Sequence, residues 1–287
     1  MVDERGQVLL VQRDDSRTWA PPGGAMDAGE MPPEAAAREV EEETGLKVLP
    51  VRLVGVHYLR LWQREYLSFG FRCLRRGGEL KPSRETPAVG FFNLAQPPGR
   101  MASTHYQRLA RGLTHEDTRP YWGTQRPSLS MTLTRGLLLP FVYRFLDWQR
   151  RRRGEPVYQK PPGWLVETRL IVRNEAGEVL WLRDAGNQWR LPAGKRRARE
   201  APWDAAARAA AAAGMEVQLL DFAGSAFAPN NQITLAFTAA ETARPDANAA
   251  VAYFAADKMP THALPADIAH VQNALLPQPI YFRRDEL

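Results

Sequence analysis

The chain has 287 residues, enough for two domains of ordinary size, and its 44% hydrophobic and 24% charged residues are typical of globular proteins. The formal net charge is +6 and the isoelectric point is about 9.7. A diffuse arginine excess is compatible with small anionic ligands but is typical of a solvated surface, so we do not expect nucleic acid as a partner. Cys73 is the only cysteine, which excludes a disulfide bond within the chain.

No segment of the sequence indicates secretion or membrane insertion. The first ten residues, MVDERGQVLL, contain no apolar signal core. The most apolar run, Gly136–Leu146, is much shorter than a membrane span and contains Pro140 and Arg144. We therefore expect no membrane span and a cytoplasmic location. A linker helix is favoured for this run over a helix that lies on a membrane surface.

The first half of the chain follows a definite order of signals. The strand GQVLLVQR (Gly6–Arg13) precedes the loop WAPPGG (Trp19–Gly24) and an Ala- and Glu-rich helical segment that ends at Gly45. The strand EYLSFGFRCL then alternates apolar residues on one face, and VGFF (Val89–Phe92) is a short aromatic strand. A last helix carries His105 and Gln107.

The second half repeats this order after a Pro-, Arg- and aromatic-rich connector at 119–162, for which we expect one helix. Its counterparts are GEVLWLRD, WRLPAG, an Ala-rich helix ending at Gly214, QITLAF, VAYF, and a helix with His270 and Gln272. Strands on both sides of a helix indicate mixed sheets covered by helices. We predict two tandem α/β/α sandwich domains, at 1–118 and 163–287.

The two halves differ at their first strand. The second half has WLVETRLIVRN (Trp164–Asn174) before its hairpin, whereas the first half starts almost at its hairpin, with Met1 and Val2. The first domain is therefore expected to lack most of its opening strand. Two explanations stay open: the true start lies upstream of Met1, or another segment fills the slot.

A spaced motif in the first half carries the chemistry. Gly24 is followed after five residues by Glu30, and after seven more by REVEEETGL (Arg38–Leu46). This stretch matches the Nudix box at every specified position, so the first domain resembles the Nudix hydrolase family.

The residues themselves predict a metal site. Pro32 and Pro33 suit a helix start and Gly45 a helix end, which makes 34–44 a helix of about three turns. Glu39, Glu42 and Glu43 then share one face, where like charges repel unless a cation lies between them. Hard carboxylate oxygens suit Mg²⁺, with Mn²⁺ as a second possibility.

Other roles follow from the resemblance or from the loop sequence. In the family pattern, Glu30 supports the metal site and Arg38 tethers a box carboxylate, so Arg38 is included with Glu42 among the catalytic candidates. Gly23 and Gly24 let the loop turn tightly and approach a ligand. Glu41 points away from the cluster.

The general base lies outside the box in many Nudix enzymes. Glu85, in the loop SRETPAVGFF, is one candidate for the base or an extra metal ligand; the alternative is a surface loop or structural salt bridge. His105 is less suited, since its counterpart His270 lies in a copy without the acids, which indicates a helix-start or packing role.

The second half has lost the acids of the box. Gly194, Glu200 and Arg208 keep the spacing, but five alanines, Ala209–Ala213, replace the Glu cluster. Alanine preserves the helix, so the fold is expected to remain without a hydrolytic site. The domain is either an inert partner or, through its loop cations, a binder of phosphate; the cations are Lys195, Arg196, Arg197 and Arg199.

The sequence thus predicts an Mg²⁺-dependent pyrophosphohydrolase with its chemistry in the first domain. The expected substrate is a small nucleoside diphosphate derivative, such as an ADP-ribose-like compound, or a nucleoside triphosphate, such as a modified dNTP. The alternative is a nucleotide-sensing regulatory or binding protein with little turnover. A homodimer is left open. Trp19, Tyr58, Trp62 and Phe69 could stack a base, but strand aromatics are also typical core residues.

Overall fold

The computed structural model describes residues 1–61, 64–117, 119–127, 129–133, 139–154, 163–228, 231–243, 250–276 and 281–284. Trp62, part of the apolar run at 136–138 and Ala247 lie outside these ranges. The chain divides into two compact units, Met1–Asp117 with Trp122–Pro162, and Thr118–Tyr121 with Gly163–Leu287. In the described residues, no helix is long and apolar enough to cross a membrane.

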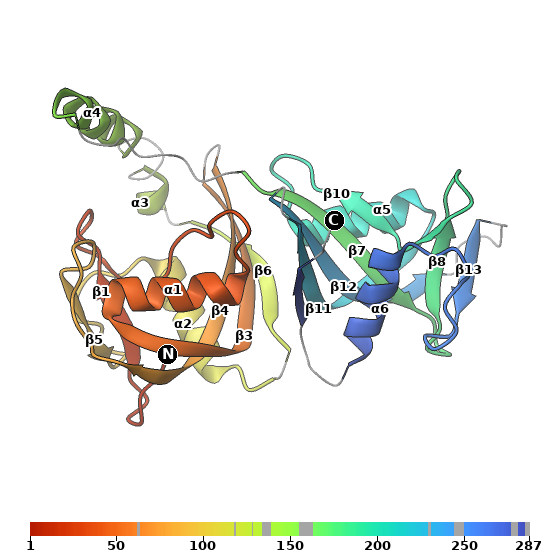
Figure 1. Ribbon diagram of the computed structural model, residues 1–287, viewed down its shortest axis with the longest axis horizontal. Coiled ribbons are helices and arrows are strands. Elements are labelled where there is room, and N and C mark those ends of the chain that lie inside the picture. Colours follow the sequence, from red (N-terminus) through yellow and green to blue (C-terminus); the bar gives the residue numbers. More distant parts are fainter. Residues whose placement is uncertain are drawn as a thin grey trace. The chain divides into compact units, whose positions relative to one another are not determined.

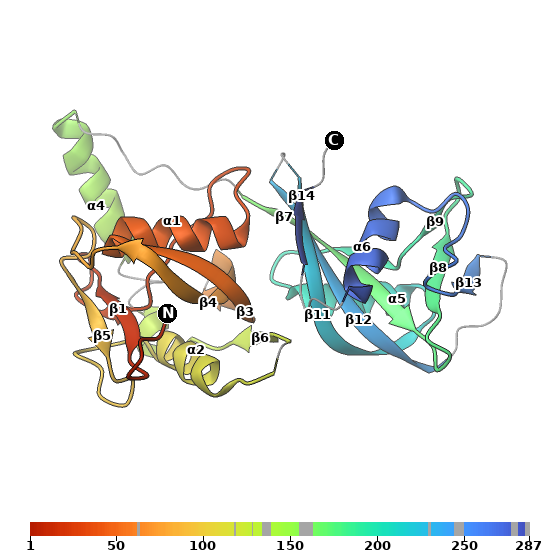
Figure 2. The ribbon, with the colours of Figure 1, turned by 60° about the horizontal axis from the view of Figure 1, so that its bottom comes forward.

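The first unit contains two three-stranded sheets (Figures 1 and 2). One has the order β2 (Trp19–Ala20), β1 (Val8–Gln12), β5 (Ala88–Phe92). The other has the order β4 (Arg64–Gly78), β3 (Leu46–Leu61), β6 (Tyr121–Gln125). Strands β3 and β4 form a long antiparallel hairpin that pairs Leu46 with Gly78 at one end and Leu61 with Arg64 at the other.

Two helices cover opposite faces of β1. Leu9 packs with Val40 of α1 (Pro32–Thr44), whereas Val8 and Leu10 belong to a cluster with Leu109 of α2 (Ser103–Thr114). Alternate residues of a strand point to opposite faces, so α1 and α2 enclose β1 as the outer layers of a sandwich. This layer arrangement brings the carboxylates of α1 to the surface beside the Gly23–Gly24 loop.

The second unit forms a mixed eight-stranded sheet. Its main order is β13 (Val251–Phe254), β8 (Val179–Arg183), β7 (Leu165–Arg173), β12 (Gln232–Ala243), β11 (Glu216–Ala228), β14 (Tyr281–Arg284). Two short strands, β9 (Trp189–Arg190) and β10 (Ala193–Lys195), pair with β8 and β7. The β7–β12 and β11–β14 pairs are parallel, and the other pairs are antiparallel.

Helices α5 (Pro202–Ala212) and α6 (Pro265–Leu275) lie on the two faces of this sheet (Figure 1). Ile171, Ala236 and Val271 belong to the core beneath α6. On the α5 side, a Cβ added to Gly194 would lie 2.8 Å from the backbone oxygen of Ala205, so glycine allows the helix to approach β10. The predicted α/β/α class with mixed sheets is thus confirmed, and the mixture of parallel and antiparallel pairs is seen in the sheet of the second unit.

Strand β7 marks the difference between the two units. It pairs in parallel with β12 over Leu165–Arg173 and meets β8 at Arg173–Val179, so one strand joins both parts of the sheet. Among the described residues of the first unit, no strand joins β1 to β4, and Val2 makes only an isolated bridge to Val8. The side chains of β4 are correspondingly more exposed than those of β12.

The connector contains more regular structure than the single helix that its composition predicts. Its described residues include strand β6, the short helix α3 (Leu129–Thr132) and helix α4 (Leu139–Arg152). Strand β6 adds to the sheet of β3. A five-residue strand whose partner is far away in sequence has too little alternation to be recognised from its own residues.

Candidate active site

Helix α1 starts and ends close to the predicted positions. It begins at Pro32, where the missing amide hydrogen costs nothing, and the Glu34 carboxylate accepts a bond from the Met31 amide at 2.9 Å. It ends at Gly45, which has φ +73° and donates to the Glu41 carbonyl at 2.8 Å. A Cβ at Gly45 would lie 2.5 Å from the backbone oxygen of Glu79. These limits place the box acids on the last two turns.

The guanidinium of Arg38 joins most of the box. Its Nε donates to Glu30 Oε1 at 2.9 Å, and its Nη2 donates to Glu30 Oε2 at 2.9 Å and to the Ala25 carbonyl at 3.0 Å. The remaining nitrogen, Nη1, donates to Glu39 Oε1 at 2.9 Å and Glu42 Oε2 at 3.2 Å. Arg38 therefore fixes the loop to the helix and orients two acids, which is a positioning role.

The Gly23–Gly24 loop lies directly against the acids of the helix. The Gly23 amide donates to Glu43 Oε2 at 2.9 Å. A Cβ on Gly24 would lie 2.4 Å from Glu39 Oε1. Both glycines thus lie against the box carboxylates, whereas the sequence predicted only that they let the loop turn tightly and approach a ligand.

Burial and like charge act together on Glu43. Desolvation is the largest effect and, with the charges of Glu39 and Glu85, it outweighs the Gly23 hydrogen bond and the Arg13 charge and raises the pKa of Glu43 to about 7. Burial likewise raises the pKa of Glu39, against the opposing effect of Arg38. In contrast, Glu42 and Glu41 are exposed, and Glu41 makes its ion pair with Lys47 at 3.6 Å.

The Glu85 loop is attached to the end of α1. Thr86 Oγ1 donates to the Glu43 carbonyl at 2.6 Å, and the Asp14 amide donates to the Glu85 carbonyl at 3.0 Å. The Glu85 side chain is exposed, and its charge is close enough to contribute to the raised pKa of Glu43. The structure thus brings Glu85 to the box. Thr86, which holds the loop there, was missed because no spacing rule marks it.

The other candidates are placed away from the carboxylates or in the core. His105 lies in the first turn of α2. Trp19 is buried and packs edge-on against Phe92, with ring centroids 4.9 Å apart. Tyr58 is also buried, and its hydroxyl donates to Glu65. Trp19 and Tyr58 are therefore core residues, and neither presents a free ring face for a base.

The second unit repeats the loop without the acids. Arg208 donates from Nε and Nη2 to Glu200 at 2.7 and 2.9 Å, and from Nη2 to the Lys195 carbonyl at 2.9 Å. These bonds match those of Arg38 with Glu30 and Ala25. The left-handed residue before each glutamate is also shared, as Gly29 has φ +78° and Arg199 has φ +65°. We call this arrangement, in which an arginine of the helix holds a glutamate and a carbonyl of the loop, the loop frame. The frame is kept in the second unit, although alanines replace the carboxylates of the helix.

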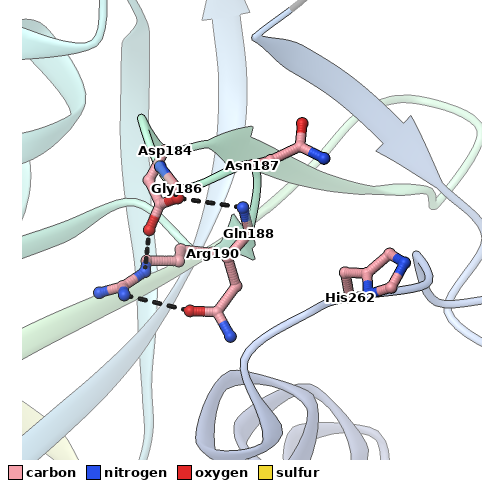
Figure 3. Close-up of a pocket in the computed structure, with 6 residues that line it drawn as sticks. All are labelled: Asp184, Gly186, Asn187, Gln188, Arg190 and His262. Carbon is pink, nitrogen blue, oxygen red and sulfur yellow. Dashed lines mark hydrogen bonds and ion pairs between the residues drawn. The ribbon is translucent and has the colours of Figure 1, made fainter.

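A pocket in the second unit is a separate feature (Figure 3). Its carboxylate, Asp184, accepts hydrogen bonds from the Gly186 and Gln188 amides at 2.9 and 3.0 Å and pairs with Arg190 at 2.7 Å. These contacts hold the pKa of Asp184 below its ordinary value. The negative charge of Asp184 is therefore already paired with groups of its own loop and strand. Asn187 and His262 complete the lining.

The chemistry of the first-unit acids fits a hard divalent cation. In the described part of the chain, no three acidic, histidine or cysteine side chains are arranged to hold a metal ion; Glu39 and Glu42 bind Arg38, and Glu43 binds Gly23. The donors are nevertheless all carboxylate oxygens on one helical face. Burial, with a smaller contribution from the negative charge of Glu39, raises the pKa of Glu43, and a bound Mg²⁺ would favour the ionised form of this carboxylate.

Comparison with known proteins agrees with this arrangement. The family model of the NUDIX domain matches residues 1–112 and 164–275, one stretch in each unit. The chain is 36% identical to a MutT-like protein of Streptomyces ambofaciens over 39% of this chain and 72% of that protein. It is 37% identical to the 8-oxo-dGDP phosphatase NUDT18 of Mus musculus over 29% of this chain and 26% of that protein.

A third relative, named ADP-ribose pyrophosphatase, comes from Methanocaldococcus jannaschii and is 32% identical over 37% of this chain and 64% of that protein. The chain thus spans less than two thirds of the length of two of these three relatives. The names of these relatives include a phosphatase and a pyrophosphatase, which places them among hydrolases of phosphate bonds. The chain belongs to the NUDIX domain family, as its box predicted.

Proposed function

We propose that the first unit is an Mg²⁺-dependent pyrophosphohydrolase of a small nucleotide. The substrate class is a nucleoside diphosphate derivative or a nucleoside triphosphate; the names of two relatives, for 8-oxo-dGDP and for ADP-ribose, support the diphosphate part of this class. The observation that carries the proposal is the set of contacts by which Arg38, Gly23 and Gly24 gather Glu39, Glu42 and Glu43 on one face.

Each residue has a distinct role in this proposal. Glu39, Glu42 and Glu43 hold the cation, and Glu30 supports them through its paired hydrogen bonds with Arg38. When bound, Mg²⁺ neutralises phosphoryl charge and lowers the pKa of a coordinated water. Mn²⁺ suits the same oxygen donors. Arg38 holds Glu39 and Glu42 in place and does not contact the substrate.

The reaction is attack of water on a phosphorus of the diphosphate bridge. The water oxygen forms the new P–O bond, the bridging P–O bond breaks, and its electron pair stays on the leaving phosphate. The water proton passes to a general base, for which Glu85 is our candidate. Its loop is fixed to α1 by Thr86, and its charge acts on Glu43, so it lies within the same electrostatic site.

The test compares two neighbouring glutamates on α1. Glu42→Gln keeps the shape of the side chain but removes a charge at the metal, so we expect turnover of a nucleotide panel to fall more than about a hundredfold, since even partners behind metal ligands cost 10–100-fold. Glu41→Gln removes the same charge one residue away, where the side chain pairs with Lys47, and should retain activity within a factor of about two.

Phosphate and pyrophosphate release should be measured with Mg²⁺, with Mn²⁺ and with EDTA. Equal turnover by Glu42→Gln and wild type at saturating Mg²⁺ would contradict the metal site. A panel without any Mg²⁺-dependent product, combined with nucleotide binding, would instead favour a nucleotide-sensing protein. The frame around Arg208, which lacks acids, keeps that second function in consideration.

A further inference from the structure

The two box loops share one backbone frame but carry opposite charge. Between Gly24 and Glu30 the only charged residue is Asp27, whereas four cations lie between Gly194 and Glu200. On the helices, Glu39, Glu42 and Glu43 correspond to Ala209, Ala212 and Ala213. Three carboxylates of the first unit are thus replaced by alanine, and the fourth, Asp27, is replaced by a cation. The four loop cations of the second unit are Lys195, Arg196, Arg197 and Arg199.

The hydrogen bonds show that the frame is the same. The Asp27 amide donates to Glu30 Oε2 at 2.9 Å, and the Arg197 amide donates to Glu200 Oε2 at 2.7 Å. Asp27 and Arg197 therefore occupy matching positions, and the charge at that position is reversed. The reversal does not come from a refolded loop, since the Arg38 and Arg208 contacts to the loop also correspond.

The guanidinium nitrogen Nη1 of the frame arginine has different surroundings in the two units. In the first unit, Arg38 Nη1 is used by Glu39 and Glu42. Ala209 and Ala212 stand at those positions in the second unit, and in the described parts of the chain the hydrogen bonds of Arg208 use only Nε and Nη2. A guanidinium nitrogen at the same place thus lacks the carboxylates that its counterpart binds.

Among the described residues, nearby acids do not offset the charges of Lys195 and Arg197. Glu200 accepts two bonds from Arg208 and is held by the Arg197 amide. Glu167 lies 3.7 Å from Lys195 Nζ, but it also pairs with Arg169 at 3.3 Å. The Lys195 side chain is 87% exposed, and Arg197 is exposed as well, so both can turn toward a ligand in solution.

We propose that this loop is an oligophosphate-binding site that needs no metal ion. Arg208 Nη1 and the side chains of Lys195 and Arg197 supply donors and positive charge that suit the oxygens of a diphosphate or triphosphate group. In the first unit a cation must stand between phosphate and carboxylates; in the second unit the protein itself provides the positive charge. The ligand is inorganic pyrophosphate or the phosphate chain of a nucleotide.

The test uses the full chain in EDTA and measures binding of pyrophosphate by calorimetry at low salt, where charged contacts are least screened. Ala212→Glu restores the acid that Glu42 supplies in the first unit and places it one turn from Arg208. It should weaken pyrophosphate affinity about tenfold or more, the equivalent of one charge-assisted hydrogen bond. Ala211→Glu adds the same charge at the neighbouring exposed position and should change affinity by less than about threefold.

A second pair of variants removes cations. Arg197→Gln should weaken binding several-fold, whereas Arg5→Gln, an exposed arginine of the first unit, should not. Repeating the titration with ADP distinguishes a nucleotide site, which binds ADP at least as well, from a site for free pyrophosphate. Absence of pyrophosphate binding at millimolar concentration, or equal effects within each variant pair, would overturn the proposal. Because the assay contains no Mg²⁺, its result is separate from that of the hydrolysis test.

Discussion

The α-carbon of Gly24 faces the carboxylate of Glu39 so closely that a Cβ would lie 2.4 Å from Oε1 and 2.6 Å from Oε2. Gly24→Ala must therefore displace the Glu39 side chain or the loop. We expect kcat/KM to fall about a hundredfold, because displacements near 1 Å at catalytic groups have effects of that size. The measurement is steady-state hydrolysis of the best panel substrate at saturating Mg²⁺.

A matched control for this substitution is Gly77→Ala in β4. A Cβ there meets no atom within 4 Å, so activity should remain within a factor of about two. Thermal melts should show both variants folded, because Glu39 can turn toward solvent without disturbing the buried side of α1. Full activity of Gly24→Ala would show that the position of Glu39 does not matter for the reaction.

Local signals were sufficient for α1 and for its acids. Pro32, Pro33 and Gly45 mark its ends, and the box spacing places the acids. The contacts made by Gly24 and Thr86 could not be read in the same way. A glycine indicates freedom of the backbone without naming the side chain that it approaches, and Thr86 meets Glu43 only because two distant segments pack together.

The same distinction applies to the sheets. Apolar alternation indicates strands β4 and β12, yet it does not say which strand lies beside each. Only the pairing of β7 with β12, and the lack of a corresponding partner for β4 in the described residues, shows why the two repeats differ in exposure. Pairing over long sequence separations is a property of the folded chain that no short window contains.

Glu85→Gln tests the proposed general base. If Glu85 accepts the proton of the attacking water, the amide should lower kcat at least tenfold, leave the apparent Mg²⁺ affinity nearly unchanged, and flatten the acidic limb of the pH–rate profile. Glu79→Gln, an equally exposed glutamate before the same loop, is the control for charge and should keep the profile. An unaltered acidic limb in Glu85→Gln would assign the base to another group.

A triple variant tests whether the second unit has any hydrolytic activity. With Glu39, Glu42 and Glu43 all changed to glutamine, the second unit remains intact in the full chain, but we expect Mg²⁺-dependent release to fall to the uncatalysed background for every nucleotide. The reason is the run Ala209–Ala213, which offers no oxygen ligand beyond the backbone. Residual turnover that depends on Mg²⁺ would place a second hydrolytic site outside the box.

Each unit also contains a buried histidine with a lowered pKa. Burial lowers the pKa of His57 in β3 to about 3, with further contributions from Arg108 and Arg111 of α2. Burial lowers the pKa of His270 in α6 to about 3 as well, aided by Arg283 and Arg169. The ordinary pKa of a histidine is about 6.5. Between this pH and pH 3, these histidines are protonated in the unfolded chain but neutral in the folded chain.

The part of the folding stability that depends on these two residues is complete above pH 6.5 and is lost as the pH falls toward 3. At pH 5 the loss is about 2 kcal/mol for each histidine, from 1.36 kcal/mol per pH unit below 6.5. Glu43, with its pKa raised to about 7, acts in the opposite direction in metal-free protein.

Comparison of the wild type with single variants therefore isolates the contribution of each histidine. His57→Gln and His270→Gln should each reduce the fall in unfolding free energy between pH 7 and pH 5 by about 2 kcal/mol, measured by urea denaturation in EDTA. A variant with the wild-type pH dependence would show that the histidine it replaces is protonated in the folded chain.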